Sequence, residues 1–409
     1  MLELLSPAGN AEKLKTAVYF GADAVYFAGK KYGLRASCDN FEADEIEEYI
    51  KYCHRHGVKA YITINIIAHN DDLNGLDEYI KYLEKIGADA VIAADIGVIC
   101  RIREAAPGLA IHVSTQANIT NKYAAKFFAD LGVKRLILAR ELSITEIKEI
   151  REYIPNEVEL EAFVHGAMCI SYSGRCLLSN YLSGRDSNRG QCVQACRWEY
   201  SISEKSRRGS FYDVIEDERG TYILNSKDLN MLEHLRALID VGVTSFKIEG
   251  RMKSPYYVAT VTNAYRRVLD KMKEDINYKP IKTLKDELYK ASHRQYTTGF
   301  NFKDRFKEER ECLESSMPVQ THEFMALVLE DRKDGFVLVQ QRNRFEVGEE
   351  LEILSPNDTF NKKFKVTKIK NLNGKEVEMA KLVQEKLMLK TKLSLKAGDI
   401  LRKRVAGGG

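Results

Sequence analysis

A repeated pattern of one glycine followed by a continuous apolar run organises the first part of the chain. It occurs as GADAVYFAG from Gly21, GVKAYITIN from Gly57, GADAVIAAD from Gly87, GVKRLILAR from Gly132 and GVTSFKIEG from Gly242. A glycine in this position typically ends a helix, and an unbroken apolar run of this length is typical of a strand buried on both faces. The pattern therefore predicts parallel strands.

Charged stretches with helical periodicity lie between these strands, among them EADEIEEYIKYCHRH and LDEYIKYLEKIG. Three further apolar segments, LELLSPA at the start, AIHVSTQ at 110–116 and ELEAFVHG at 159–166, raise the number of predicted strands to eight. Eight such units over residues 1–310 favour an α/β fold of the (β/α)8, or TIM-type, barrel. A doubly wound open sheet is the competing topology, because periodicity alone does not separate the two.

The chain leaves this repeat between the seventh and eighth strands. Residues 167–240 form a cysteine-containing insertion, in which RWEYSIS and TYILNSKD are typical of a hairpin. Because the insertion follows the carboxyl end of a strand, we expect it where barrel enzymes place their active site. Over residues 311–405 the pattern changes to short alternating strands and turn residues, which predicts a small β-barrel domain.

Composition indicates a cytoplasmic protein with no membrane contact. No apolar run approaches the roughly 18 residues of a membrane span, and MLELLSPAGNAEKL lacks the basic and apolar regions of a secretion signal. Thiols stay reduced in the cytoplasm, so clustered cysteines there are more often metal ligands or redox groups than disulfides.

Four of the eight cysteines lie close together, as Cys169-x6-Cys176-x15-Cys192-x3-Cys196. Structural zinc prefers paired ligands about two to four residues apart, which only the last pair satisfies. Iron–sulfur clusters accept more varied spacing, so the spacing leaves a cluster, zinc and no metal open. The other four are scattered and are expected to be small apolar side chains: Cys38, Cys53, Cys100 and Cys312.

The segment EAFVHGAMCISYSGRCLLS at 161–179 closely resembles the signature of the peptidase U32 family. NSKDL at 225–229, KIEGRMKSPYYVATVTNAYR at 247–266 and the C-terminal β domain are similar to later blocks of that family. The chain is most similar to the branch that hydroxylates the wobble uridine of tRNA to 5-hydroxyuridine without molecular oxygen, with prephenate as the implied co-substrate. Relatives carry a 4Fe-4S cluster, and the resemblance implies its ligands here: Cys169, Cys176, Cys192 and Cys196.

A hydroxylation that uses prephenate requires cations for a dicarboxylate and a dry pocket for the base. The carboxyl ends of the predicted strands supply candidates for substrate binding, Arg35, Asn65, Gln116 and Arg140, and for catalysis, His165, Lys247, Glu249 and Arg251. Arginine binds carboxylates bidentately, and Arg251 directly precedes a predicted helix N-terminus. An internal ion pair is an equally good interpretation of Lys247 and Glu249, and for His165 a histidine packed beside the cluster is the preferred interpretation.

Positive charge gathers at the C-terminal end. Residues 361–409 contain 14 Lys and Arg against 4 Asp and Glu, a balance of +10, which leaves −6 for the rest of the +4 chain. Such a surplus is what RNA phosphates attract, although lysines on a strand are also typical of a solvated face. The segment SHRQYTTGFNFKDRFK mixes Tyr296, Phe300 and Phe302 with basic residues and either stacks an unpaired base or belongs to the core.

The sequence therefore predicts an iron–sulfur tRNA uridine 5-hydroxylase with tRNA and prephenate as partners, acting alone, as a homo-oligomer or with a U32 paralogue. Three alternatives stay open: a metal-dependent or cysteine peptidase or collagenase, a hydroxylase of 23S ribosomal RNA, and an RNA-binding scaffold without catalysis. The peptidase receives little support, because the chain contains neither His-Glu-x-x-His nor Gly-x-Ser-x-Gly.

Overall fold

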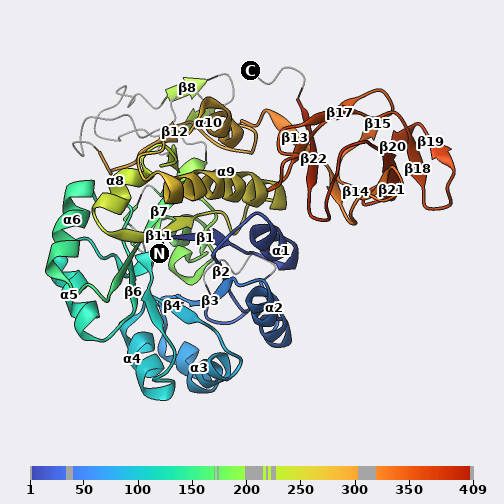
Figure 1. Cartoon of the computed structure of the whole chain (residues 1–409). Helices are drawn as coiled ribbons and strands as arrows, with labels where there is room; N and C mark the ends of the chain where they lie inside the picture. Colours follow the sequence, from blue (N-terminus) through green and yellow to red (C-terminus); the bar gives the residue numbers. More distant parts are fainter. Residues whose placement is uncertain are drawn as a thin grey trace, which may run out of the picture.

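The computed structural model describes residues 2–33, 40–169, 171–172, 175–198, 215–217, 220–222, 227–302 and 319–405. Within them, eight parallel strands pair in the order β11-β1-β2-β3-β4-β5-β6-β7, and a pairing of β11 with β7 closes the ring. The closed ring, viewed along its length in Figure 1, confirms the predicted (β/α)8 barrel over the open sheet. Its strands are β1 Glu3–Pro7, β2 Ala24–Phe27, β3 Lys59–Ile64, β4 Ala90–Ala93, β5 Ile111–Val113, β6 Arg135–Ile137, β7 Glu159–Ala167 and β11 Val243–Ile248.

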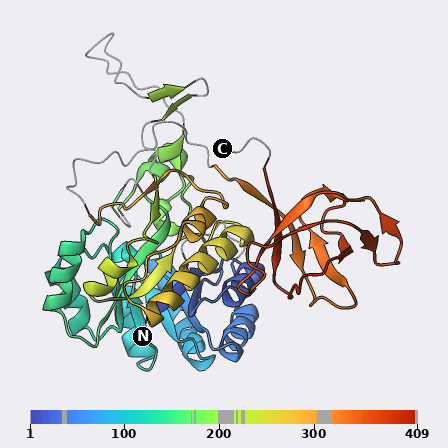
Figure 2. The ribbon, with the colours of Figure 1, turned by 45° about the horizontal axis from the view of Figure 1, so that its top comes forward.

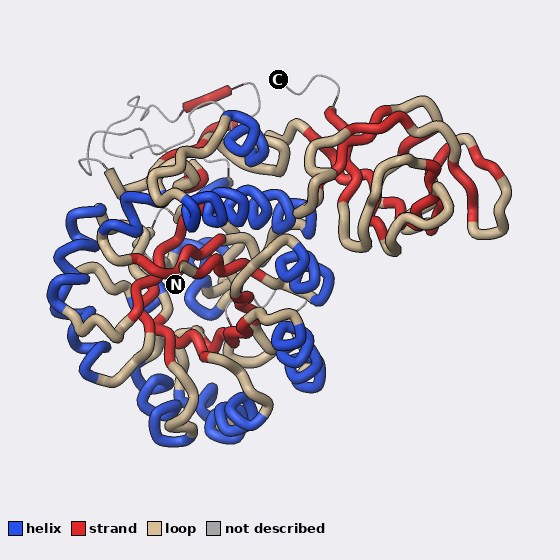
Figure 3. The backbone as a smooth tube through the Cα atoms, viewed as in Figure 1, coloured by secondary structure: helices blue, strands red, loops and turns tan. Residues whose placement is uncertain are grey.

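Helices surround the strands, as Figure 3 shows by colour. Five of them begin at a side chain that accepts a hydrogen bond from their first turn, Asn10, Asp95, Asn121, Ser143 and Ser254. The five glycines of the sequence pattern have φ between 70° and 91°, a conformation that favours glycine after a helix. The helices are α1 Ala11–Tyr19, α2 Ala43–Arg55, α3 Leu76–Lys85, α4 Ile96–Ala105, α5 Lys122–Asp130, α6 Ile144–Tyr153, α8 Leu235–Asp240, α9 Pro255–Glu274 and α10 Lys282–Leu288.

The insertion after β7 contains short elements only. The first part holds α7 (Leu178–Ser183) and the turns η3 (Ser187–Arg189) and η4 (Ala195–Arg197), and β10 (Asp228–Asn230) then returns antiparallel to β7. Within the described residues, β9 (Gly220–Tyr222) at the start of TYILNSKD pairs with β8 (Ile215–Asp217). Most of RWEYSIS lies outside the described residues. Figure 2 shows the β8–β9 hairpin at one end of the barrel and the C-terminal domain at its side.

The C-terminal domain is an antiparallel β structure with its own apolar core. Eight strands pair in the order β17-β16-β22-β13-β14-β21-β18-β19, and β15 pairs with β20. The boundary predicted at residue 311 falls within 303–318, outside the described residues. The strands are β13 His322–Val328, β14 Phe336–Gln341, β15 Phe345–Glu346, β16 Glu350–Leu354, β17 Lys363–Lys365, β18 Ile369–Asn371, β19 Glu376–Val377, β20 Met379–Ala380, β21 Lys386–Lys390 and β22 Ile400–Arg404.

A buried ion pair joins this domain to the barrel. Arg402 of β22 is fully buried, and its Nη2 lies 2.9 Å from Oε2 of Glu287 on α10, which is also fully buried. Arg267 of α9 donates further hydrogen bonds of 3.0 Å to the carbonyl oxygens of Ser355 and Pro356. Breaking a buried pair leaves an uncompensated charge, so these contacts hold the domain in one position against the barrel. No helix in the described part of the chain is long and apolar enough to cross a membrane.

Candidate functional site

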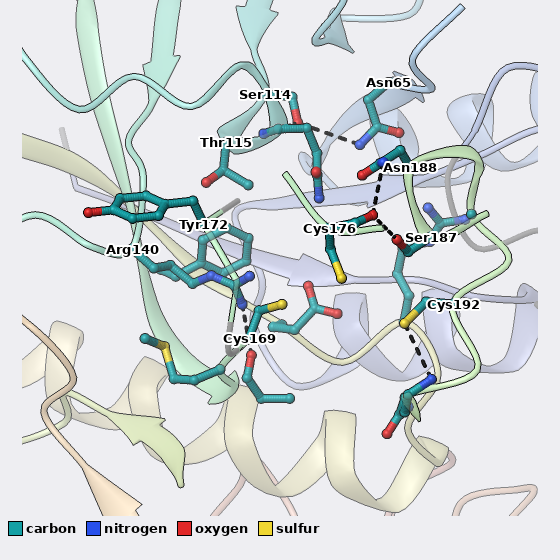
Figure 4. A pocket seen from close by; sticks show the side chains of 18 of the residues that line it. Asn65, Ser114, Thr115, Arg140, Cys169, Tyr172, Cys176, Ser187, Asn188 and Cys192 are labelled. Carbon is teal, nitrogen blue, oxygen red and sulfur yellow. Dashed lines mark hydrogen bonds between the residues drawn. The ribbon is translucent and has the colours of Figure 1, made fainter. Parts of the chain in front are cut away.

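A cavity of about 200 Å³ lies at the carboxyl ends of the barrel strands. Its wall combines residues that follow β3, β5, β6, β7 and β11 with residues of the insertion (Figure 4). Of the predicted site residues, the structure brings ten together in this wall: Asn65, Gln116, Arg140, Lys247, Glu249, Arg251, Cys169, Cys176, Cys192 and Cys196. Arg35 lies outside the described residues. A cavity in this place, between strand ends and an insertion, is where (β/α)8 enzymes carry out their chemistry.

The four clustered cysteines all face this cavity as free thiols. Cys169 and Cys192 are exposed, and the other two are half-buried. Within the described residues, no three histidine, cysteine or acidic side chains are gathered closely enough to hold an ion. The donor set nevertheless fits an iron–sulfur cluster by its chemistry, because four thiols from one chain border a single cavity. Ligation requires the sulfurs to approach one another more closely than they do here.

Hydrogen bonds reach two of the thiols, and at Cys176 they favour the thiolate, which is the form that binds metal. The backbone N–H of Gln194 lies 3.4 Å from Sγ of Cys192. Burial raises the pKa of the Cys176 thiol, but hydrogen bonds from the Ser171 hydroxyl and from backbone N–H groups of α7 outweigh burial and bring that pKa below its ordinary value. The surroundings of Cys176 therefore favour the thiolate that a metal ligand requires.

The insertion fixes the backbone at Cys176. Ser187 Oγ and Asn188 Nδ2 donate to the Cys176 carbonyl oxygen at 2.7 and 3.0 Å. The Asn188 carbonyl oxygen in turn accepts from the backbone N–H of Ile67, which follows β3. These contacts tie the cysteine segment to the barrel.

Lys247 forms the floor of the cavity. Its Nζ lies 2.9 Å from Oε1 of Glu161 and 4.4 Å from the centre of the Tyr26 ring. Glu161 is fully buried and also accepts from Arg135 Nη1 at 2.9 Å. The predicted internal ion pair of Lys247 therefore exists, but the structure pairs it with Glu161 and not with Glu249. The amine is therefore held by one carboxylate and by two aromatic rings, since its Nζ also lies 5.5 Å from the centre of the Phe163 ring.

Two arginines face the same space from strand ends that lie two positions apart in the ring, Arg140 after β6 and Arg251 after β11. Arg251 donates from Nη2 to Asn40 Oδ1 at 2.7 Å and from Nη1 to Thr63 Oγ1 at 3.4 Å. Arg140 donates from Nη1 to the Ala167 carbonyl oxygen at 2.8 Å, and its guanidinium lies 5.2 Å from the centre of the Phe163 ring. With Lys247, they place three cations around a cavity that has apolar walls of Tyr26 and Phe163. Cations in such a wall can bind a carboxylate, although the wall also contains the carboxylate of Glu249.

His165 lies outside the cavity wall. Its ring is 1 % exposed and packs against Tyr257, Tyr265 and Tyr296 at 5.3–6.0 Å between ring centres. The cause is a β-bulge: Lys247 pairs with Phe163 and Ile248 with His165, so Val164 is an extra residue on β7. A bulge breaks the alternation of side chains. Phe163 therefore faces the cavity while His165, two residues later, does not.

Burial of His165 makes the stability of the fold depend on pH. Burial lowers its pKa from 6.5 to about 3, whereas the unfolded chain takes up the proton near 6.5. Stability is therefore lost as the pH falls below about 6.5, by about 1.4 kcal/mol per pH unit from this histidine. In urea unfolding between pH 7 and 5, we expect His165→Gln to show a shallower pH dependence than wild type. The exposed His56→Gln is the control, and equal slopes for His165→Gln and wild type would contradict this account.

Sequence analysis missed several residues of the cavity wall. Tyr26 and Phe163 lie within apolar runs, where cavity-lining and core aromatic side chains give the same signal. Thr63 had a usable signal, because it precedes Asn65 by two residues and therefore lies on the same face of the strand. The base-stacking candidate Tyr296 instead stacks on His293 at 4.8 Å between ring centres and packs at a tilt against His165.

Fold and cavity together define a class: a (β/α)8 barrel with a cysteine-lined cavity at its carboxyl end and an antiparallel β domain against its side. Sequence profiles identify that class, since "Peptidase family U32" matches residues 9–311 and "Peptidase family U32 C-terminal domain" matches residues 320–402. The chain belongs to peptidase family U32.

Curated relatives in this family have names of two kinds. "tRNA hydroxylation protein P1" of Bacillus subtilis is 39 % identical over 403 residues, which cover 98 % of this chain and 94 % of the relative. "23S rRNA 5-hydroxycytidine C2501 synthase" of Escherichia coli is 39 % identical over 67 % of this chain and 40 % of its own length. "Collagenase" of Porphyromonas gingivalis is 34 % identical over 66 % of this chain and 65 % of its own length. The family thus includes proteins named for RNA hydroxylation and a protein named for proteolysis.

Proposed function

We propose that this protein hydroxylates RNA, that its substrate is uridine in tRNA, and that prephenate supplies the hydroxyl group. One observation carries the proposal: four thiols of the iron–sulfur type and three cations border the same cavity, in a chain similar over 98 % of its length to a protein named for tRNA hydroxylation. Neither a structural zinc site nor an RNA-binding scaffold requires cations that bind a dicarboxylate beside its thiols.

The residues of the cavity divide this task. Cys169, Cys176, Cys192 and Cys196 would hold the 4Fe-4S cluster, which supplies single electrons when bound. Arg140 and Arg251 bind the two carboxylates of prephenate, and their fixed guanidinium groups orient its ring. The hydroxylation of a C–H bond is a two-electron oxidation of the base. A co-substrate that gives up its hydroxyl oxygen accepts the same two electrons. Its C–O bond is replaced by a C–H bond, and the reduced co-substrate leaves.

Lys247 and the apolar walls prepare the cavity for this exchange. The Lys247 ammonium, paired with Glu161, places a hydrogen-bond donor at the floor, where it would orient the prephenate hydroxyl group whose oxygen is transferred to the base. Tyr26 and Phe163 exclude water from the space above it, which strengthens the hydrogen bonds of the cations. Apart from Glu161, which pairs with Lys247, these roles need only residues of the cavity wall.

A peptidase is the second candidate, and the structure gives it little support. A cysteine hydrolase needs a histidine within hydrogen-bonding distance of its thiol. Among the described residues that line the cavity there is no histidine, and His165, four residues before Cys169, is buried among tyrosines.

The test is a reaction under argon with purified protein carrying its cluster, followed by mass spectrometry of digested nucleosides. We expect 5-hydroxyuridine in tRNA only when prephenate is present, and no product from a fragment of 23S ribosomal RNA. Gelatin added in a parallel reaction should stay intact. Hydroxylation of the ribosomal fragment instead would correct the substrate, and cleavage of gelatin without prephenate or RNA would overturn the proposal.

A further inference from the structure

The outer face of the C-terminal sheet carries an apolar row bordered by lysines. In the register of β14, β21 and β18, Leu338 lies opposite Met388, and Met388 lies opposite Lys370. On either side of this row, Phe336 pairs with Lys390 and Gln340 with Lys386. Side chains of paired positions project to the same face. We call these residues the lysine face: Phe336, Leu338, Met388, Lys370, Lys386 and Lys390.

Alternation along the strands shows that this face points away from the domain core. In β21, Leu387 and Leu389 are fully buried, while Lys386 and Lys390, which flank these two leucines along the strand, are exposed. In β14, Val337 and Val339 are fully buried in the same way. The core of the domain is therefore complete without the lysine face.

The positive charge of the lysine face is largely uncompensated. Neither Lys386 nor Lys390 forms an ion pair with another described residue, and Lys370 Nζ lies 4.9 Å from the centre of the Phe336 ring. The acidic side chain opposite Lys370 is Glu376, which pairs with Lys368 of the same strand edge. Glu376 is exposed, and its carboxylate is attracted by Lys370 and Lys390 as well as by Lys368, so one carboxylate offsets part of the charge of the three lysines. Three ammonium groups thus border a half-buried apolar floor.

We propose that the lysine face binds the phosphate backbone of tRNA while the bound uridine occupies the cavity. The identification of tRNA as the ligand rests on the proposed function, whereas the binding of a polyanion follows from the face itself. Lysines that contact phosphates release condensed counterions, which supplies sequence-independent affinity. An extended, flat row of cations suits a nucleic acid backbone better than a single small anion, which needs converging donors.

The junction between the domains gives this face a fixed position relative to the cavity. The Arg402–Glu287 pair and the Arg267 hydrogen bonds hold the domain against α9 and α10. In Figure 1 the sheet lies beside the barrel and not across its open end. A tRNA bound at the lysine face is therefore held at the side of the barrel, which leaves the mouth of the cavity free for its anticodon loop.

The test compares two triple variants of the full-length protein. Lys370→Gln, Lys386→Gln and Lys390→Gln together remove the lysine face, and Lys362→Gln, Lys363→Gln and Lys365→Gln remove three exposed charges at the opposite edge of the sheet. The affinity for tRNA is measured by fluorescence anisotropy over a range of salt concentrations. We expect the first variant to bind roughly ten- to a hundredfold more weakly at about 0.1 M salt, with a slope against log salt smaller by about 2. The control should bind as wild type does.

The catalytic readout separates this inference from the proposed function. With saturating tRNA, the lysine-face variant should hydroxylate at the wild-type rate and show only a raised KM for tRNA. Wild-type affinity in that variant would overturn the lysine face while hydroxylation continued to support the proposed function. A changed sedimentation profile with unchanged tRNA affinity would overturn it in favour of self-association. Failure of the wild-type protein to bind tRNA at all would overturn both proposals.

Discussion

The Cys169→Ser protein is expected to fold normally but to contain no iron or acid-labile sulfide and to form no hydroxyuridine. Cys169 follows the end of β7, is exposed and forms no disulfide, so the fold does not depend on its sulfur. A serine hydroxyl is a poor ligand for iron in a site of soft thiolates. Protein purified under argon, analysed for iron and sulfide and examined by visible absorption, measures the loss directly.

Cys100→Ser is the matched control, since it makes the same change at a half-buried thiol on α4. The control and the wild type should both contain about four iron and four sulfide per chain. A Cys169→Ser protein with the full content of both would remove Cys169 from the ligand set. Stoichiometric zinc without sulfide in the wild type would replace the cluster by a zinc site.

The Arg135→Met protein is expected to lose about 3–5 kcal/mol of its free energy of unfolding. Arg135 is 3 % exposed and its guanidinium joins Glu3, Glu159 and Glu161 inside the barrel. Without it, Glu161 keeps only Lys247 and the Ser245 hydroxyl, and Glu3 keeps the Tyr61 and Ser245 hydroxyls and a distant Lys59. Urea unfolding followed by circular dichroism measures the loss at neutral pH.

The same variant has a predicted pH dependence. Burial raises the pKa of Glu3, but hydrogen bonding and charge attraction from Arg135 outweigh it and bring the pKa below 4.5. In the wild type this contribution is present above about pH 4.5 and lost as the pH falls. In the variant, burial without Arg135 favours the protonated carboxyl, so the difference between the two proteins should narrow toward acidic pH.

Arg101→Met provides the comparison, because Arg101 pairs with Asp77 at the surface, where solvent screens the pair, and its loss should cost far less stability. If Arg135→Met were no more destabilising than this control, the buried network would not hold the barrel. Such a result would also leave the position of Lys247 unexplained.

Much of the site could be predicted because it follows from the strand ends. The apolar runs locate the strands, and polar residues directly after a run, such as Asn65 and Arg140, must lie at one end of a parallel barrel. The cysteines were found by their clustering. Both signals are local in the sequence, and both depend on residue type alone.

Other parts of the site depend on contacts that the sequence does not display. The partner of Lys247 is Glu161, 86 residues away, and the pair forms only through the β7–β11 register. The bulge at Val164 gives no signal in the neighbouring sequence, because the residues that stabilise it are distant in the chain. The Val164 carbonyl oxygen accepts hydrogen bonds from the Tyr265 hydroxyl and from the backbone N–H of Met231. His165 was a candidate because it lies near the carboxyl end of a predicted strand, whereas the bulge turns its side chain toward the tyrosines.

The central claim is that this cavity transfers oxygen from a dicarboxylate to RNA, and isotope labelling tests it most directly. Prephenate labelled with heavy oxygen at its hydroxyl group is incubated under argon with the cluster-loaded protein and tRNA, and the nucleosides are weighed by mass spectrometry. The account predicts 5-hydroxyuridine that contains the heavy oxygen. If 5-hydroxyuridine formed in the presence of labelled prephenate contained only light oxygen, its oxygen would come from water, and this result would contradict the account.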